Sequence, residues 1–164
     1  MEHLWSPWRL AYITGASSST GCVFCNIQAD DAADSLVVFR GKTCFVILNL
    51  FPYNNGHLMV IPNRHIASLT AANDDELHEL IALTQACEAA LTEAYAPHGM
   101  NMGINLGKPA GAGVLDHVHM HVVPRWNGDS NFMTVTAGTR VLAEDLGDTA
   151  ARLRPIFARM SATT

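Results

Sequence analysis

The sequence predicts an α+β domain, in which one long helix lies across a face of an antiparallel sheet of about five strands and a second helix follows near the C-terminus. Runs of β-branched and aromatic residues, bounded by turn residues, recur along much of the chain and are typical of short strands. Between residues 73 and 96 the apolar residues instead recur every three or four positions, which is the period of a helix with one apolar face.

Three strands are expected before the long helix. The first two, "SLVVF" (35–39) and "TCFVILNL" (43–50), are separated by "GKT", which supplies the tight turn of a hairpin. The third, "GHLMVIP" (56–62), follows the turn "FPYNNG". Short turns of this kind join neighbouring antiparallel strands, so we expect a meandering sheet.

The long helix is expected to start after Asn73 and to stop before Pro97. Asn73 is a good N-cap residue, and the acidic residues that follow it suit the positive end of the helix dipole. Pro97 and Gly99 are typical of a helix end. The predicted apolar face of the helix consists of Leu77, Leu80, Ile81, Leu83, Thr84, Cys87, Leu91 and Tyr95.

Two further strands and a helix complete the predicted fold. "NMGINLG" (101–107) is expected to form one strand. After a loop, "HVHMHVV" (117–123) should form another, which Pro124 stops because proline cannot donate a ladder hydrogen bond. The last segment should be helical from about Ala143 to Met160, with Pro155 either interrupting the helix or marking its first turn.

Length and charge indicate one domain (1–164), made of an N-terminal arm (1–20), a core (21–135) and a C-terminal helical segment (136–164). The chain has a net charge of −5 and only ten scattered Lys and Arg residues, which leaves no basic stripe for extended nucleic acid. No apolar run approaches the roughly 20 residues of a membrane span, and the start of the chain lacks a signal-peptide pattern. We therefore expect a cytoplasmic protein without membrane contact.

His117, His119 and His121 occupy alternate positions of the last predicted strand, so their side chains should share one face. Successive imidazoles would be about 6–7 Å apart, too far for all three to bind one metal ion through bonds of about 2.0–2.1 Å. A chain of phosphoryl groups fits this spacing better, with one imidazole as nucleophile and another as hydrogen-bond donor. The alternative is that the histidines only decorate a half-exposed strand.

The segment before these histidines, Asn105 to Asp116, is rich in glycine. Glycine lets backbone N–H groups approach an anion closely, as in phosphate-binding nests. Such a loop by itself is more often an ordinary turn. Joined directly to the histidine row, it is expected to form the other half of a phosphate site.

Cys22 and Cys25 have the spacing of half a zinc site, and in a reducing compartment the pair is a metal clip, a redox pair or a coincidence. A thioredoxin-like redox role is poorly supported, because the pair lacks a preceding strand and a following βαβ pattern. Cys44 and Cys87 lie within apolar patterns and are expected in the core.

"HVHMHVV" resembles the His-x-His-x-His-x-x signature of the histidine triad (HIT) superfamily. The resemblance extends through "VILNLFPYNNGHLMVIPNRH" and "NMGINLG" to "VPRWNGDSNFM", from about residue 22 to 133. "LWSPWRLAYI" together with "CVFC" is similar to the branch of bacterial fragile-histidine-triad-like proteins and diadenosine tetraphosphate phosphorylases.

The resemblance implies a HIT-like fold and a homodimer whose sheets join into one. It also implies a nucleotidyl hydrolase or transferase that cleaves dinucleoside polyphosphates at an α-phosphorus, by hydrolysis or by phosphorolysis. Two alternatives stay open: a purine nucleoside phosphoramidate hydrolase, as in the other main HIT branch, and a zinc-stabilised nucleotide-binding module without turnover. Motif spacing does not distinguish water from phosphate as the acceptor.

The family pattern assigns roles to four histidines. His119 would be the nucleophile, oriented by a backbone carbonyl at His117, while His121 would contact phosphate and His57 would border the same site. The resemblance further implies nucleotide contacts from Asn49, Leu50, Asn105, Ala112, Gly113 and Val114. "GAGV" lacks the Gln, Ser or Thr side chain common in relatives, so only backbone contacts carry over to that part of the loop.

In zinc-containing relatives, two histidines complete the metal site begun by the cysteine pair. They match His65 and His117, so the resemblance implies a closed, structural zinc site of Cys22, Cys25, His65 and His117. The alternative is a pair of thiols without metal.

Overall fold

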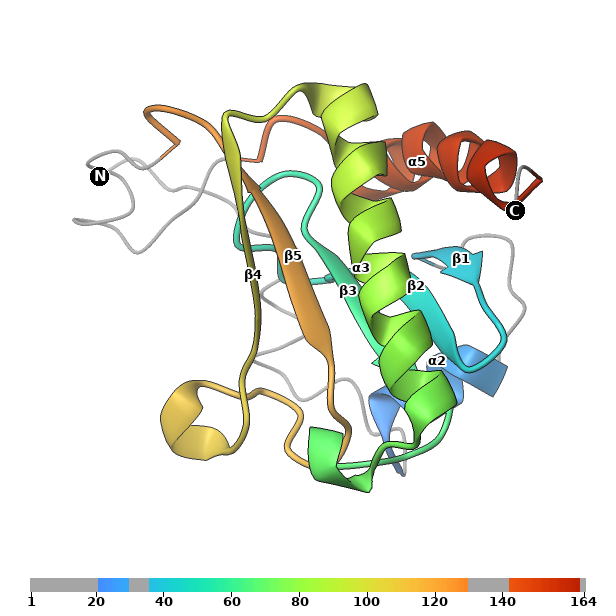
Figure 1. Cartoon of the computed structure of the whole chain (residues 1–164). Helices are drawn as coiled ribbons and strands as arrows, with labels where there is room; N and C mark the ends of the chain where they lie inside the picture. Colours follow the sequence, from blue (N-terminus) through green and yellow to red (C-terminus); the bar gives the residue numbers. More distant parts are fainter. Residues whose placement is uncertain (1–20, 30–35, 130–141, 163–164) are drawn as a thin grey trace.

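The computed structural model describes residues 21–29, 36–129 and 142–162. Within these ranges five strands form one antiparallel sheet in the order β1-β2-β3-β5-β4 (Figure 1). The helices and strands are α2 (Val23–Ala29), β1 (Val37–Arg40), β2 (Cys44–Leu48), β3 (Leu58–Pro62), α3 (Asp74–Tyr95), β4 (Gly99–Ile104), β5 (Met120–Arg125) and α5 (Leu146–Ser161). The predicted α+β class is confirmed. The expected N-terminal arm (1–20) lies outside the described residues.

The last strand, β5, does not continue the meander but lies between β3 and β4. His121 therefore has a neighbour on each side, Met59 of β3 and Gly103 of β4. Because both flanks of β5 are hydrogen-bonded, His121 is held in the interior of the sheet. At the opposite margins, β1 and β4 are the edge strands of the described sheet (Figure 1).

The prediction that Pro124 ends the last strand is wrong. β5 runs to Arg125, and Pro124 pairs with Met100 of β4. The ladder with β3 ends at Val122, and the Pro124 carbonyl accepts a hydrogen bond from Asn54 Nδ2 on that side. The N–H and C=O of a strand residue point to the same side, so the N–H that proline lacks would have pointed toward the side on which β3 no longer pairs. Pro124 therefore costs the sheet no ladder hydrogen bond.

Helix α3 begins with the cap that the sequence predicts. The Asn73 side chain accepts from the Glu76 N–H, and the Glu76 carboxylate accepts from the Asn73 N–H, which together form a capping box. The helix ends at Tyr95, and the C-cap residue that follows, Ala96, has a left-handed conformation (φ 45°). The prediction that Ile81 belongs to the buried apolar face is wrong, because Ile81 is 60% exposed.

Pro155 neither interrupts nor starts the C-terminal helix, since α5 is continuous from Leu146 to Ser161. Proline in a helix interior removes the hydrogen bond to the carbonyl four residues earlier, here that of Ala151. Both Pro155 and Ala151 are exposed, so water can solvate that carbonyl. Leu153 and Phe157, on the opposite side of α5, are buried in the main core.

The two faces of the sheet carry different layers. Leu58 and Val60 point to the face covered by α3 and α5, where the main core lies (Figure 1). Met59 and Ile61 point to the other face and pack with Phe24 of α2. Helix α2, which contains Cys25, was not predicted from the sequence. The candidate site is built on this second face.

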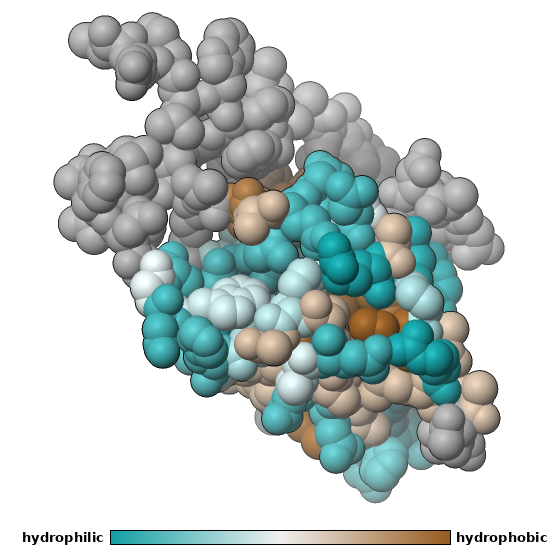
Figure 2. Space-filling view, turned by 90° about the horizontal axis from the view of Figure 1, so that it is seen from above, coloured by the Kyte–Doolittle hydropathy of each residue, from teal (hydrophilic) through white to brown (hydrophobic). Residues whose placement is uncertain are grey.

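The exterior of the described residues is mixed in polarity. On the face of the molecule seen in Figure 2, hydrophilic residues alternate with apolar ones around small, scattered, strongly hydrophobic areas. A membrane-crossing helix is not found among the described residues, because none of their helices is both long and apolar enough.

Candidate active site and metal centre

The three histidines of the motif do not form the single row that the sequence predicts. Strand β5 begins only at Met120, so His117 and His119 lie in the segment that leads into it. The reason is a change of partner: the Val118 N–H donates to the Ile66 carbonyl, away from the β3 ladder. The His117 ring consequently lies beside His65, 5.0 Å between centroids, whereas His119 and His121 remain together.

His57, His119 and His121 form a buried group of imidazoles. Their side chains are 0%, 4% and 8% exposed, respectively. The ring centroids of His119 and His121 are 4.9 Å apart, and those of His57 and His121 are 5.1 Å apart. The rings are thus closer than the strand repeat alone would place them. The structure brings together these three sequence-predicted residues.

The proton positions of His57 and His121 follow from one backbone donor. The Tyr53 N–H donates to His57 Nδ1 over 3.0 Å, so the proton of neutral His57 is on Nε2. That Nε2–H donates to His121 Nδ1 over 2.9 Å. Neutral His121 therefore has its own proton on Nε2, the nitrogen left free to donate to a ligand.

The opposite tautomer is fixed at His119. Its Nδ1 lies 2.9 Å from the His117 carbonyl oxygen, which can only accept, so Nδ1 carries the proton. The Nε2 atom then keeps a free lone pair. Burial lowers the pKa of His119, although the hydrogen bond to the carbonyl acts in the opposite direction. A neutral imidazole with an unprotonated Nε2 is the form needed for nucleophilic attack.

His121 is also neutral at physiological pH. Burial, and to a smaller extent the charge of a protonated His119, lower its pKa to about 4. His121 can therefore donate its Nε2–H without being a cation. One neutral acceptor and one neutral donor thus stand side by side on the sheet.

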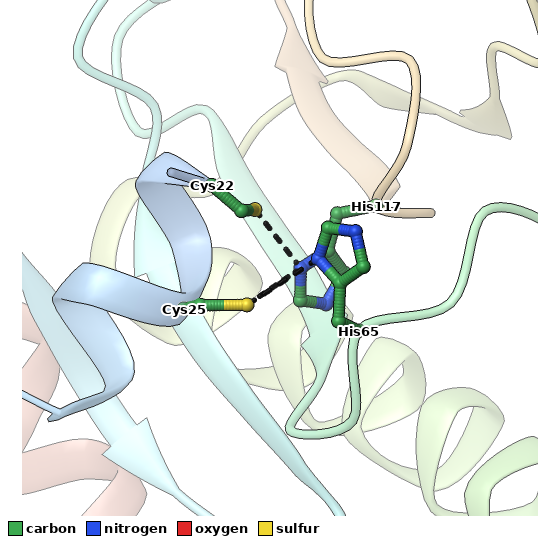
Figure 3. A group of neighbouring side chains, drawn as sticks. All are labelled: Cys22, Cys25, His65 and His117. Atoms are coloured by element: carbon green, nitrogen blue, oxygen red, sulfur yellow. Dashed lines mark hydrogen bonds between the residues drawn. The ribbon is translucent and has the colours of Figure 1, made fainter. Parts of the chain in front are cut away.

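A second cluster unites Cys22, Cys25, His65 and His117, all four residues of the predicted metal site (Figure 3). Their candidate ligand atoms lie within 4.8 Å of one another. Cys22 Sγ is 3.3 Å from His117 Nδ1, and Cys25 Sγ is 3.4 Å from His65 Nδ1. Tetrahedral zinc, with bonds of about 2.3 Å to sulfur and about 2.0–2.1 Å to nitrogen, separates such atoms by about 3.6 Å. The donor set and its spacing fit a zinc ion.

The elements around this cluster hold its members in ligating form. His117 Nε2 lies 2.8 Å from the Pro62 carbonyl and must donate to it, which leaves Nδ1 as the unprotonated nitrogen that faces the thiols. His65 follows Arg64, whose guanidinium donates to both carboxylate oxygens of Glu76 at the start of α3. A third hydrogen bond from Arg64, to the Ala71 carbonyl, fixes the same segment.

Only some of the residues predicted to contact the nucleotide lie close to the histidines. Asn49 is half-buried, and its Nδ2 lies 3.4 Å from His57 Nδ1. Val114 packs against the apolar group beneath α2. Leu50 is 52% exposed. Asn105, Ala112 and Gly113 lie in the loop between β4 and β5, which contains the short 3₁₀ helix η2 (Lys108–Ala110).

Two aromatic residues of the site were missed by sequence reasoning. The Phe24 ring lies 5.2 Å from that of His119, and the Tyr53 ring lies 4.7 Å from that of His57. Phe24 stands inside the CxxC segment, which is the signal that could have pointed to it. Arg125 pairs with Asp129 at 2.6 Å.

A His-x-His-x-His segment that leads into an interior strand of the sheet, with the middle imidazole oriented by the carbonyl of the first, defines a histidine triad protein. A family model described as HIT domain matches residues 31–128. The chain belongs to the HIT family. The family resemblance seen in the sequence is thereby confirmed.

Individual relatives extend the likeness to nearly the whole chain. The AP-4-A phosphorylase of Mycobacterium tuberculosis (strain ATCC 25618 / H37Rv) is 41% identical over 167 residues, which cover 97% of this chain and 86% of that protein. Protein hit of Bacillus subtilis (strain 168) is 30% identical over 114 residues, 70% of this chain and 77% of that protein. A solved structure of a Zn-bound histidine triad family protein from Mycobacterium smegmatis has a TM-score of 0.71 at 31% identity, covering 90% of this chain and all of that one (100%).

Proposed function

We propose that the protein is an enzyme that cleaves dinucleoside polyphosphates of the diadenosine tetraphosphate type at an α-phosphorus, through a nucleotidyl-His119 intermediate. The observation that supports this most directly is the pair of fixed tautomers, with a lone pair on His119 Nε2 beside a proton on His121 Nε2. The 41% identical relative named AP-4-A phosphorylase supports the substrate class.

In the first step, the lone pair of His119 Nε2 attacks the α-phosphorus, and the P–O bond to the leaving nucleotide breaks with its electron pair on oxygen. The Nε2–H of His121 donates a hydrogen bond to the phosphoryl or leaving oxygen, where negative charge develops. As a bond forms at Nε2, the imidazole of His119 becomes cationic, and the His117 carbonyl that accepts its Nδ1–H stabilises that charge.

In the second step, water or inorganic phosphate attacks the same phosphorus, the P–N bond breaks, and Nε2 regains its lone pair. Water releases a proton to the solvent as it attacks, whereas phosphate attacks through an oxygen that is already unprotonated, and either acceptor returns His119 to its starting form. Our proposed nucleotide contacts remain Asn49, Leu50 and Asn105, together with the backbone of Ala112, Gly113 and Val114.

The reaction is tested by incubating the protein with diadenosine tetraphosphate, with and without inorganic phosphate, and separating the products. ADP plus ATP that appear only with phosphate identify a phosphorylase, and AMP plus ATP without phosphate identify a hydrolase. Substrate labelled at the α-phosphate should leave label on the protein when the reaction is quenched in alkali, where P–N bonds to imidazole survive. His119→Ala should carry no label.

Absence of turnover in both conditions would contradict the proposal. Turnover of a nucleoside phosphoramidate instead would move the protein to the other main HIT branch. Binding of nucleotide with an equal affinity in wild type and His119→Ala, and no turnover of either substrate, would indicate a binding module.

We propose that Cys22, Cys25, His65 and His117 hold a structural zinc ion, because four ligands close the coordination shell and leave no position for substrate. When bound, zinc would supply a rigid crosslink between α2, the segment after β3 and the segment before β5. The test is metal analysis of the purified protein, expected to give about one zinc per chain. Cys25→Ser should lower that content and the melting temperature.

We further propose a homodimer in which the two sheets join through β4. Within the described residues β4 is an edge strand, and Met102 on it is 42% exposed. An unpaired strand edge is a ready template for antiparallel pairing with a second copy. The proposal also fits the position of β4, which lies directly beside the histidine strand β5 (Figure 1).

A further inference from the structure

The side chain of Phe24 lies between the metal cluster and the candidate nucleophile. Its ring centroid is 5.6 Å from that of His117 and 5.2 Å from that of His119. The side chain is only 5% exposed. In the sequence Phe24 stands between Cys22 and Cys25, so one short segment carries both thiols and the aromatic ring.

The imidazole of His119 is confined on three sides. Its Nδ1–H is bonded to the His117 carbonyl, and the His121 ring meets it edge-on at 75°. Phe24 meets it at 58° from a different element of the fold, α2. A flip of the His119 ring would replace Nδ1 by a carbon, break the hydrogen bond and turn Nε2 away. Phe24 is buried and packs against this ring, so it limits the space in which the ring can rotate or tilt.

Helix α2 cannot hold this ring in place by itself. It has seven residues, too few for a stable isolated helix. Near its C-terminal end, the Arg40 guanidinium donates to the carbonyls of Ile27 and Gln28. Near its N-terminal end, Phe24 packs with Met59 and Ile61 of the sheet, and the two cysteines add contacts with His65 and His117.

We propose that Phe24 is a positioning residue for His119, and that metal binding by Cys22 and Cys25 holds Phe24 against it. This rests on the proposed nucleophilic role of His119. The consequence is that the metal cluster acts on the reaction indirectly, through the orientation of one imidazole. Loss of Phe24 should lower kcat more than it raises KM, because the substrate still binds while Nε2 is misdirected.

The first test compares Phe24→Ala and Phe24→Leu with a control, Phe39→Ala. Phe39 stacks on Phe157 at 5.7 Å on the opposite face of the sheet, so the control removes an aromatic ring without touching the site. Nitrogen NMR of labelled histidine rings reports which nitrogen of His119 is protonated. We expect the wild type and the control to show only the Nδ1–H form.

Phe24→Ala should show a mixture of both tautomers and a kcat lower by roughly 10- to 100-fold, the range expected when a reacting atom is displaced by about 1 Å. Phe24→Leu keeps most of the apolar volume, should fold even where the alanine variant does not, and should restore most of both readouts. The positioning role would be overturned if a folded Phe24 variant had a lowered kcat and yet showed the same His119 spectrum as the wild type.

The second test removes the metal from the otherwise unchanged full-length chain with a chelator at neutral pH. The same tautomer mixture should appear at His119 although Phe24 is present, and zinc added back should reverse it. An unchanged His119 spectrum after complete metal loss would refute the link between cluster and ring. The spectra need no turnover, so a tautomer change in a protein that cleaves no dinucleoside polyphosphate would disprove the proposed function and leave the positioning role standing.

Discussion

At the scale of single residues, a backbone group decides where each buried imidazole carries its proton. The Tyr53 N–H fixes His57 and, through it, His121. The carbonyls of Pro62 and His117 fix His117 and His119 in turn. Backbone groups cannot change their protonation state, so these tautomers do not depend on pH near neutrality. Before any ligand binds, His121 Nε2 is therefore a hydrogen-bond donor and His119 Nε2 is an acceptor.

His57→Ala should lower kcat by roughly 10²-fold, within the range of general acid–base contributions, with a smaller effect on KM. The reason is that His121 loses the partner that keeps its proton on Nε2. Steady-state kinetics with diadenosine tetraphosphate measure this. Tyr53→Phe keeps both the ring and the backbone donor, so it should retain most of the rate. Equal losses in the two variants would speak against a role for the tautomer.

The low pKa of His121, about 4 through burial, predicts a pH dependence of stability. In the unfolded chain the ordinary value is 6.5, so the unfolded state binds more protons between the two values. The stabilisation is complete above pH 6.5 and is lost as the pH falls toward 4.

Urea unfolding should therefore show that the free energy of unfolding falls between pH 7 and pH 5. This fall should be smaller in His121→Asn than in the wild type, by about 1–2 kcal/mol. Comparing the two proteins removes the contribution of every other titrating group that they share. An identical loss in both would mean that His121 titrates normally.

At the scale of elements, the sequence is enough to locate each described strand and both long helices, because their periodicity is local information. Ile81 and Pro124 show where local information fails. Ile81 fits the helical period and is nevertheless exposed, and Pro124 stays within a strand because its neighbour on one side has already ended. Both outcomes depend on which element lies opposite, which spacing along the chain does not encode.

The sequence largely predicts which of the site residues lie close together, and predicts less of how they are arranged. The CxxC spacing indicates two of the metal-ligand candidates and the family resemblance implies the other two, and the structure places all four close together. The motif spacing also indicates that His119 and His121 are neighbours. It does not reveal that His117 turns away from the row, because this follows from the hydrogen bond of Val118 to Ile66 in a distant segment. Phe24 was missed for a related reason: seven helical residues are too short for a recognisable period.

Glu79 connects α3 to the turn between β1 and β2. Its carboxylate accepts hydrogen bonds from the backbone N–H groups of Lys42, Thr43 and Cys44. Burial raises the pKa of this carboxyl, but the hydrogen bonds from the Thr43 hydroxyl and the three amides outweigh it and lower the pKa overall. One side chain thus caps the whole turn.

Glu79→Ala should therefore lower the free energy of unfolding by roughly 2–3 kcal/mol, because it leaves several turn N–H groups without an acceptor. Denaturant unfolding measures the change. Glu88→Ala, at an exposed position of the same helix, is the matched control and should change stability by less than about 0.5 kcal/mol. Similar values for both would show that the cap contributes little.

At the scale of the whole molecule, the proposed dimer makes a prediction about mass. Met102→Lys should shift the protein from dimer toward monomer in light scattering, because a lysine on an edge strand opposes pairing with a second copy. Ala151→Lys adds the same charge at an exposed position of α5, which contacts β1 at the opposite edge of the sheet, and should leave the mass unchanged. A Met102→Lys dimer of wild-type affinity would contradict pairing through β4.

The position of β5 between two hydrogen-bonded neighbours also has a consequence for the cost of binding. Elements in the interior of a sheet open only with the global unfolding of the domain, so the amides of Val122 and Met120 should be among the slowest to exchange with deuterium. His121 is therefore ordered before a ligand arrives. When a nucleotide binds there, little of the interaction free energy is offset by the entropy cost of ordering the protein. More of it therefore contributes to affinity and to discrimination between ligands.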